Sequence, residues 1–316
     1  MHILHNLEDL PSNWRKTVLS IGNFDGVHRA HKLVLGKVAE RAREFGAHSL
    51  AVTFDPHPAR LLRPENAPRL ITPLPQKLAL LGQAGVEATL VLPFDAEFSS
   101  LSPQAFAKQI VADRLHACEV HEGASFRFGH HAEGNVERLS EYGREFGFNV
   151  VTYPEMRLRG EVVSSSAIRR LLSNGEVSRA RHLLGRPFAI TGTPAAGRGY
   201  GTRYTVPTIN LSAYTELAPS HGVYVTCTRI RDERFESVTN VGTRPTFAGA
   251  SFAIETHLLN FYPITLDEST EVEIAFLKWL RPEIKWSNAE ALKEQIGKDV
   301  RRSQRFFAIT GNLQPS

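Results

Sequence analysis

A glycine-rich turn near the start of the chain leads into two histidines that lie three residues apart. It comprises residues 21–31, I-G-N-F-D-G-V-H-R-A-H. Its glycines allow the backbone to turn sharply and approach a ligand closely, and the helix that follows offers unpaired N–H groups to a phosphate. His28 and His31 share one helix face, from which imidazoles can donate hydrogen bonds to a charged phosphoryl transition state. Two alternatives stay open at this point: an ordinary strand-to-helix turn, or a metal site that also uses Asp25.

Two further groups contain residue types that bind phosphate. Three consecutive hydroxyls, Ser164–Ser166, precede Arg169 at the expected start of a helix, which suits a phosphate but is also typical of an ordinary N-cap. Residues 197–211 combine a glycine stretch that could wrap phosphates with a polar P-T-I-N segment at a strand start. Glu255 lies in a β-rich run, where it is either a surface residue or, in a site, a carboxylate able to accept a proton.

The bulk composition limits the class of protein. Of the 316 residues, 42% are hydrophobic and 22% are charged, as in globular chains, and the length favours two domains. No apolar run is long enough to span a bilayer and the N-terminus lacks a basic leader, so we expect a cytoplasmic protein without membrane contact. The net charge of +4 comes from scattered basic pairs, which argues against a nucleic-acid partner. Cys118 and Cys227 are too few for a disulfide framework or a four-cysteine metal site.

The first half of the chain alternates between apolar runs and amphipathic segments. We expect strand 17–22, helix 31–45, strand 49–54, helix 75–82, strand 88–93, helix 102–114 and strand 148–153. Ser102 is the expected N-cap of its helix with Pro103 at the first position, and Gly82 is expected to end the helix before it. Such alternation predicts a parallel sheet with helices on both faces.

From about Ala189 the pattern changes to short β-rich runs separated by glycine and proline. These runs span residues 188–191, 222–228, 236–241, 252–259 and 271–277, and they predict an antiparallel barrel or sandwich. One helix closes the chain and begins S-N-A-E, in which Ser287 and Glu290 have capping-box spacing. We place the boundary within 184–188, which gives domains of residues 1–185 and 186–316.

The turn at 22–31 closely resembles the G-N-F-D-G-V-H-x-G-H signature of the bacterial bifunctional riboflavin kinase/FAD synthetase family, whose adenylyl-transferring part is an HxGH nucleotidylyltransferase. Other segments resemble family motifs in the same order along the chain: residues 53–58, 93–103, 125–129, 163–169, 199–210, 221–225, 240–247 and 255–259. The resemblance covers approximately residues 17 to 305. It implies an α/β plus β protein: a Rossmann-like nucleotidylyltransferase parallel sheet, then a riboflavin-kinase-type antiparallel β-barrel with a terminal helix.

For the first half, the resemblance implies adenylyl transfer from ATP to FMN, which gives FAD and pyrophosphate. His28 and His31 would stabilise charge at the phosphorus atom. The implied contacts to ATP and its phosphates are Gly22, Asn23, Phe24, Asp25, Gly26, Ser164, Ser165, Ser166 and Arg169. The implied flavin contacts are Pro56, His57, Pro58, Ser125 and Phe126.

For the second half, the resemblance implies ATP-dependent phosphorylation of riboflavin to FMN. Glu255 corresponds to the general base that accepts the proton of the riboflavin 5′-hydroxyl group. Thr208 and Asn210 would hold Mg-ATP, and Mg²⁺ would serve both reactions. The other implied contacts are Gly199 and Gly201, to the ATP phosphates, and Arg244, to flavin or phosphate unless it serves only a turn.

The chain departs from the family motifs at Ala30, Ser125, Asn135, Ser166, Thr205 and Ile209. Serine and asparagine keep hydrogen bonding but lose charge or bulk, and Ala30 adds a methyl group beside the expected ATP site. Two alternatives therefore accompany the bifunctional interpretation: a riboflavin kinase with an inactive or weak adenylyltransferase domain, and a non-catalytic flavin- or nucleotide-binding regulator. The expected partners are riboflavin, FMN and ATP, and homo-oligomer formation stays open.

Overall fold

The computed structural model describes residues 1–195, 208–246, 249–260, 266–267, 269–284 and 288–311; at 244–246 and 249–251 it describes only the backbone. Two compact units divide the chain, Met1–Ser165 and Ser166–Ser316. The predicted positions Gly199, Gly201 and Thr205 lie outside the described residues.

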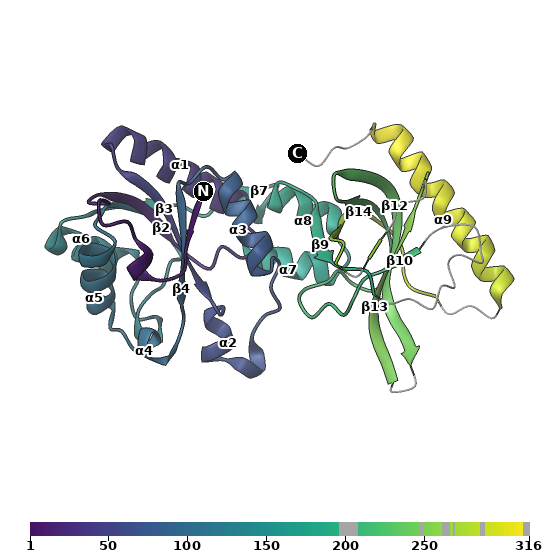
Figure 1. Ribbon diagram of the computed structural model, residues 1–316, viewed down its shortest axis with the longest axis horizontal. Coiled ribbons are helices and arrows are strands. Elements are labelled where there is room, and N and C mark those ends of the chain that lie inside the picture. Colours follow the sequence, from purple (N-terminus) through teal and green to yellow (C-terminus); the bar gives the residue numbers. More distant parts are fainter. Residues whose placement is uncertain (196–207, 247–248, 261–265, 268, 285–287, 312–316) are drawn as a thin grey trace. The chain divides into compact units, whose positions relative to one another are not determined.

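The first unit is built on a six-stranded sheet in which all neighbouring strands are parallel, in the order β1-β4-β3-β2-β5-β6 (Figure 1). Its strands are β1 (His2–Leu4), β2 (Thr17–Ile21), β3 (His48–Asp55), β4 (Ala88–Pro93), β5 (Ala117–Gly123) and β6 (Asn149–Tyr153). Its helices are α1 (Arg29–Phe45), α2 (Pro58–Leu62), α3 (Leu74–Gln83), α4 (Ala96–Ser99), α5 (Pro103–Ala105), a π-helical continuation over Phe106–Arg114, and α6 (Val136–Phe146). The short hairpin β7 (Arg157–Leu158) and β8 (Glu161–Val162) follows β6.

Helices cover both faces of this sheet, which confirms the predicted architecture. On one face, Val18 of β2 lies in a core with Leu35 of α1 and Leu81 of α3. On the other face, Leu19 lies in a core with Leu139 of α6 and with the π-helical segment. Full burial of one such leucine is worth about 1.5–3 kcal/mol. Val18 and Leu19, which are adjacent in β2, therefore pack against helices on opposite faces and hold the sheet between two helical layers.

Two predicted helix ends differ from the structure. The first helix begins at Arg29 rather than His31, because His28 is its N-cap. The helix expected to end at Gly82 continues to Gln83, where Ala84 is the C-cap. Ser102 is an N-cap as predicted, accepting a hydrogen bond of 3.1 Å from the Ala105 N–H.

The strand order contains a switch point between β2 and β5. From β2 the chain builds β3 and β4 on one side, and it then crosses back to place β5 and β6 on the other. In open α/β sheets, ligands bind beyond the carboxyl ends of the strands at such a point. The histidine-bearing turn follows β2, and the predicted segment 125–129 follows β5.

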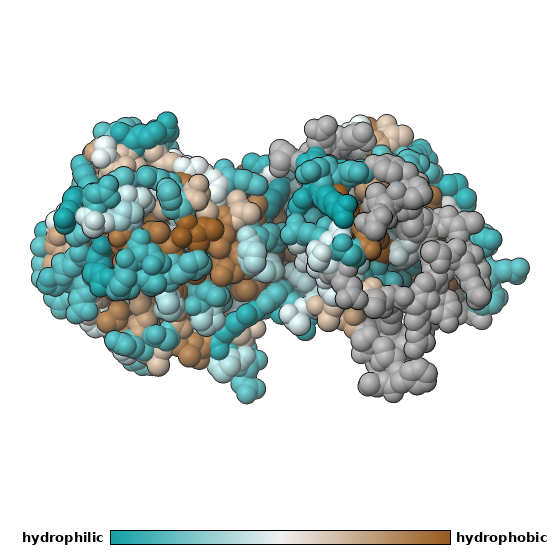
Figure 2. All heavy atoms as spheres, in the orientation of Figure 1, coloured by the Kyte–Doolittle hydropathy of each residue, from teal (hydrophilic) through white to brown (hydrophobic). Residues whose placement is uncertain are grey.

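The surface of the first unit is largely hydrophilic on the face that Figure 2 shows, with hydrophobic areas between the polar side chains. Its exposed large hydrophobic residues are Met1, Ile3, Leu33, Leu61 and Leu62. Within the described residues, no helix combines the length and the apolar character that crossing a membrane requires.

The second unit contains a curled antiparallel sheet in the order β10-β13-β12-β11-β14-β9 (Figure 1). Its strands are β9 (Phe188–Gly192), β10 (Thr208–Asn210), β11 (Gly222–Ile230), β12 (Glu233–Thr246), β13 (Gly249–Leu258) and β14 (Val272–Arg281). Its helices are α7 (Ser165–Ser173), α8 (Val177–Leu184) and α9 (Ala289–Thr310). The edges approach each other just beyond β9 and β10, where the Ala195 N–H donates to the Asn210 carbonyl at 2.8 Å. The antiparallel prediction is therefore confirmed.

The terminal helix α9 is present as predicted, but the predicted cap is wrong. Asn288 is its N-cap, and the Asn288 Oδ1 atom accepts a hydrogen bond of 2.8 Å from the Ala291 N–H. Ser287 lies outside the described residues. Serine and asparagine are about equally good caps, so the capping-box spacing from Ser287 to Glu290 was not sufficient to identify the cap.

Candidate functional sites

The turn after β2 has an unusual backbone. Gly26 has a φ of 86°, and two residues with side chains, Phe24 and Val27, also have positive φ values of 45° and 37°. Such values are costly for residues other than glycine and persist only where surrounding contacts impose them. Gly22 anchors the start of the turn through a hydrogen bond of 2.9 Å from its N–H to the Val52 carbonyl of β3.

Asp25 holds this turn against the segment before α3. Its carboxylate accepts hydrogen bonds of 3.0 Å from the N–H groups of Ile71 and Thr72. The Thr72 hydroxyl in turn accepts the Gly26 N–H at 3.0 Å. Only 3% of the Asp25 surface is exposed, so the carboxylate is directed into the protein. The role of Asp25 at the turn is thus to fix the backbone.

Lys77 of α3 is a buried basic residue beside the same turn, and no sequence motif indicated it. Its Nζ atom donates to the Asn23 carbonyl at 3.3 Å and to the Thr53 hydroxyl at 3.0 Å. Burial lowers the pKa of Lys77, and the negative charges of Asp25 and Asp55 act in the opposite direction. Lys77 therefore ties the turn to β3.

The histidine pair is brought together at the start of α1. The rings of His28 and His31 are stacked, with centroids 3.5 Å apart, and Phe24 meets His31 edge-on. The Nδ1 atom of His28 accepts the His31 N–H at 3.3 Å. A neutral His28 ring therefore carries its proton on Nε2, from which it can donate to a phosphate oxygen. Ala30 lies between them in the first turn of α1 and is partly exposed.

The alternative of a metal site at Asp25, His28 and His31 finds no support. The Asp25 carboxylate is engaged by Ile71 and Thr72, as described above. In the described part of the chain, no three His, Cys, Asp or Glu side chains form a group that could hold a metal ion.

The predicted flavin contacts follow the carboxyl ends of β3 and β5. Pro56 and His57 follow β3, and His57 caps α2 by accepting the Ala59 N–H at 3.2 Å; Pro58 is the first residue of that helix. The predicted contacts after β5 are Ser125, which is exposed, and Phe126, which is partly buried and stacked on Phe128. Both groups thus belong to the edge of the sheet that carries the histidine turn.

Glu122 lies at the switch point itself, although no sequence motif indicated it. Its carboxyl Oε1 accepts the Ile21 N–H at 2.6 Å, which links the last residue of β2 to β5. Only 4% of Glu122 is exposed, and burial raises the pKa of its carboxyl group well above the ordinary value. Burial thus favours the neutral form of this group, which holds the strand end that precedes Gly22.

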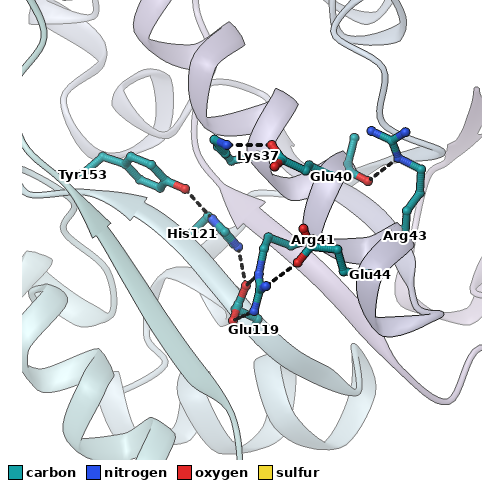
Figure 3. A network of polar contacts seen from close by, with 9 residues as sticks. Lys37, Glu40, Arg41, Arg43, Glu44, Glu119, His121 and Tyr153 are labelled. Atoms are coloured by element: carbon teal, nitrogen blue, oxygen red, sulfur yellow. Dashed lines mark hydrogen bonds and ion pairs between the residues drawn. The ribbon is translucent and has the colours of Figure 1, made fainter.

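A polar network ties α1 to β5 and β6 (Figure 3). Arg41 of α1 donates to both carboxylate oxygens of Glu119, at 2.8 and 3.1 Å. His121 bridges Glu119 and the Tyr153 hydroxyl at 2.9 and 2.8 Å. The hydrogen bond from Arg41 lowers the pKa of Glu119, whereas burial lowers that of His121. The network anchors the helix whose N-terminus carries the histidines.

The serines before α7 extend this site in part. The Ser165 hydroxyl donates to the Asp25 carbonyl at 2.8 Å, so segment 164–165 contacts the turn directly. Ser164, the preceding residue, is partly buried. Ser166 and Arg169 belong to the second unit; the serine is exposed and the arginine is partly buried on α7.

In the second unit, the predicted residues meet as cross-strand pairs. Asn210 of β10 lies directly opposite Glu255 of β13, and Thr208 lies opposite His257. Directly paired residues in antiparallel strands project to the same face, so these four side chains share one face of the sheet. Asn240 of β12 flanks Glu255 from the other side. The sequence indicated neither Asn240 nor His257.

Buried hydroxyl groups fix the opposite face of β13. Thr256 accepts a hydrogen bond of 2.9 Å from the Thr239 hydroxyl and contacts the Thr228 hydroxyl at 3.1 Å. All three threonines are fully buried. Glu255 therefore stands on a strand whose register and orientation are well determined.

The oxygen atoms at this site fit a magnesium ion that arrives with a nucleotide. Thr208 and Asn210 supply a hydroxyl and an amide oxygen, and Mg²⁺ commonly takes few protein ligands while phosphates and water complete its shell. The Arg244 backbone lies on β12 opposite Ser251, and its side chain is not among the described atoms.

Comparison with known proteins identifies both halves. A family model described as FAD synthetase matches residues 10–167, and one described as riboflavin kinase matches residues 184–307. The bifunctional riboflavin kinase/FMN adenylyltransferase of Escherichia coli (strain K12) is 33% identical over 309 residues, which are 97% of each chain. The enzyme of that name from Pseudomonas fluorescens is 35% identical over 98% of each chain.

A solved structure has the same fold over almost the whole chain. It is titled macrolide-efflux protein from Streptococcus pneumoniae, and it aligns with a TM-score of 0.85 and 25% identity over 96% of this chain and 98% of that one. The family models and the full-length relatives together lead to one assignment. The chain belongs to the family of bifunctional riboflavin kinase/FMN adenylyltransferases.

Proposed function

We propose that this protein makes FAD from riboflavin in two steps, phosphorylating riboflavin to FMN and then adenylylating FMN. The observation that carries the proposal is the presence of two separate groups of phosphate-chemistry residues. The histidine turn lies in the segment matched by the FAD synthetase model, and the Thr208–Asn210–Glu255 group lies in the segment matched by the riboflavin kinase model. We place the functional boundary at residues 185/186, close to the start of the second match.

In the first step, the riboflavin 5′-hydroxyl oxygen attacks the γ-phosphorus of ATP, and the bond to the ADP oxygen breaks. Glu255 accepts the hydroxyl proton, which requires its ionised form. Thr208 and Asn210 would hold the Mg²⁺ that accompanies the nucleotide, and this ion would neutralise charge on the phosphates. Gly199 and Gly201 cover the phosphates, and Arg244 contacts the flavin or its phosphate.

In the second step, a phosphate oxygen of FMN attacks the α-phosphorus of a second ATP, and pyrophosphate leaves. His28 and His31 donate hydrogen bonds to the oxygens that gain charge, an effect typically worth several kcal/mol. The backbone from Gly22 to Gly26 approaches the nucleotide, while Ser164, Ser165, Ser166 and Arg169 hold its phosphates. The predicted flavin contacts are Pro56, His57, Pro58, Ser125 and Phe126.

We further propose that the reactions take place in the cytoplasm on free small molecules. Both cysteines, Cys118 and Cys227, are free thiols, as is usual in a reducing compartment. Neither a nucleic acid nor a membrane is needed for the chemistry. Sedimentation of the purified protein with and without FMN would establish its oligomeric state.

The direct test is to incubate the purified chain with riboflavin, ATP and Mg²⁺ and to separate the flavins over time. The proposal expects FMN to appear first and FAD to follow. FMN without FAD would restrict the protein to kinase activity, which is the alternative raised by Ala30, Ser125 and Ser166. Unchanged riboflavin, together with unchanged FMN in a parallel incubation that starts from FMN, would refute the enzymatic assignment.

A further inference from the structure

His257 contacts a proposed ligand residue and takes no part in the mechanism described so far. Its Nδ1 atom lies 2.8 Å from the Thr208 hydroxyl oxygen, across the β10–β13 pair. Its Nε2 atom is buried, and no described residue forms a hydrogen bond with it. Burial of an unsatisfied polar atom costs stability, so a function is a reasonable explanation for its presence.

The hydrogen bond has two possible directions with different consequences for Thr208. If Nδ1 carried the proton, it would donate to the hydroxyl oxygen and occupy a lone pair. If Nε2 carries the proton, Nδ1 accepts the Thr208 hydroxyl proton, and both remaining oxygen lone pairs can face another ligand. The second arrangement makes Thr208 the better ligand for a cation, because the first leaves one oxygen lone pair free and directs the hydroxyl proton elsewhere.

We propose that His257 is a positioning residue of the kinase site. Its Nδ1 accepts the Thr208 proton and turns the hydroxyl oxygen toward the Mg²⁺ of Mg-ATP. This inference rests on the proposed kinase function and on Thr208 as a magnesium ligand. Groups that orient a metal ligand typically change metal affinity or activity about 10- to 100-fold when they are removed.

The first test determines the protonated nitrogen of His257 and needs no enzymatic turnover. Nitrogen-15 NMR of the histidine side chains distinguishes the two neutral tautomers, and His257→Asn identifies the signal. The proposal expects the His257 proton on Nε2 in the intact chain. A proton on Nδ1 would overturn the proposal. The tautomer is read in the intact chain, and the variant serves only to assign the signal.

The second test measures the Mg²⁺ concentration for half-maximal rate in each reaction separately. In His257→Val, FMN formation from riboflavin should need about tenfold more Mg²⁺, while FAD formation from supplied FMN should keep its Mg²⁺ requirement. His257→Asn should restore most of the loss, because its amide oxygen can accept the Thr208 proton. His182→Asn, on the exposed surface of α8, is the matched control.

The outcomes separate the inference from the proposed function. An unchanged Mg²⁺ requirement in His257→Val, with normal FMN formation, would overturn the role of His257 and leave the kinase assignment intact. Equal losses in His257→Val and His257→Asn would also overturn it, since an acceptor would then not suffice. Absence of FMN formation in the unmodified chain would overturn the kinase assignment and the inference together.

Discussion

At the scale of single residues, Asp25 is the clearest case in which the structure indicates a different role for a motif residue than the sequence did. It belongs to the family signature, yet its carboxylate binds the backbone of Ile71 and Thr72 rather than facing outward. Its negative charge would repel phosphate if it pointed into the ligand site. We conclude that Asp25 shapes the turn that presents the histidines.

Replacing Asp25 by Asn should therefore impair both stability and one of the two reactions. The amide keeps one acceptor oxygen but loses charge-assisted bonds, for which about 1–3 kcal/mol of unfolding free energy is expected. Urea unfolding measures this loss, and FAD formation from FMN should fall while FMN formation is retained. Asp113→Asn, which removes only a surface ion pair with Lys108, should have little effect. Equal behaviour of the two variants would contradict the proposed role.

The buried carboxyl group of Glu122 should make the stability of the folded protein depend on pH. Because folding raises its carboxyl pKa, the folded protein keeps a proton that the unfolded chain loses above about pH 4.3. Stability attributable to this group is therefore present at low pH and decreases as pH rises above that value. Glu122→Gln should raise the melting temperature relative to the unmodified protein at pH 7, and the difference should shrink toward pH 4.

The control for this measurement is Glu137→Gln, on the exposed surface of α6. It should leave the melting temperature nearly unchanged at both pH values. A Glu122→Gln difference of the same size at pH 4 and pH 7 would show that the native carboxyl group is not held in its neutral form.

At the scale of elements, the first unit depends on the position of α1, because this helix carries both histidines at its start. The Arg41–Glu119 contact attaches α1 to β5, and the same arginine contacts Glu44 on the helix surface. The two carboxylates differ in exposure, since the side chain of Glu119 is 4% exposed and that of Glu44 is 50% exposed.

This pair gives a matched experiment. Glu119→Gln should lower the unfolding free energy by about 1–3 kcal/mol, because it weakens a buried charge-assisted contact. Glu44→Gln should have little effect, as expected for an exposed ion pair. Chemical denaturation of both variants measures the difference, and a larger loss in Glu44→Gln would contradict the anchoring role of Glu119.

Much of the element pattern could be predicted from the sequence, because apolar periodicity and caps are local signals. The strand 88–93 and the Ser102 cap are found as expected. Strand β5 gave no such signal: Glu119, His121 and Glu122 interrupt its apolar pattern, and they are buried only because tertiary partners satisfy them. Local hydrophobicity cannot reveal such compensation.

The candidate sites were predictable to a similar extent. Motif resemblance indicated Thr208, Asn210 and Glu255, but it could not show that they are cross-strand neighbours. Pairing of β10 with β13 joins residues about 45 positions apart in the chain, and spacing carries no information on that register. His257 becomes visible only through this pairing, because it is the residue opposite Thr208.

At the scale of the whole molecule, each half of the chain has its own hydrophobic core and its own group of residues proposed to act on phosphates. Both proposed reactions use Mg-ATP, so removal of Mg²⁺ by a chelator should stop FMN and FAD formation alike, and added Mg²⁺ should restore both. Separation of the flavins after each addition measures the amounts of FMN and FAD that are formed. Continued FMN formation in the chelator would contradict the metal role assigned to Thr208 and Asn210.

The central claim is that two independent sites perform two successive reactions, and one pair of variants tests it most directly. Glu255→Gln and the double variant His28→Ala, His31→Ala are each supplied with riboflavin or with FMN, together with ATP and Mg²⁺. Glu255→Gln should make no FMN from riboflavin but should make FAD from FMN, while the double variant should make FMN and no FAD. Loss of both reactions in either correctly folded variant, or full kinase turnover in Glu255→Gln, would contradict the account.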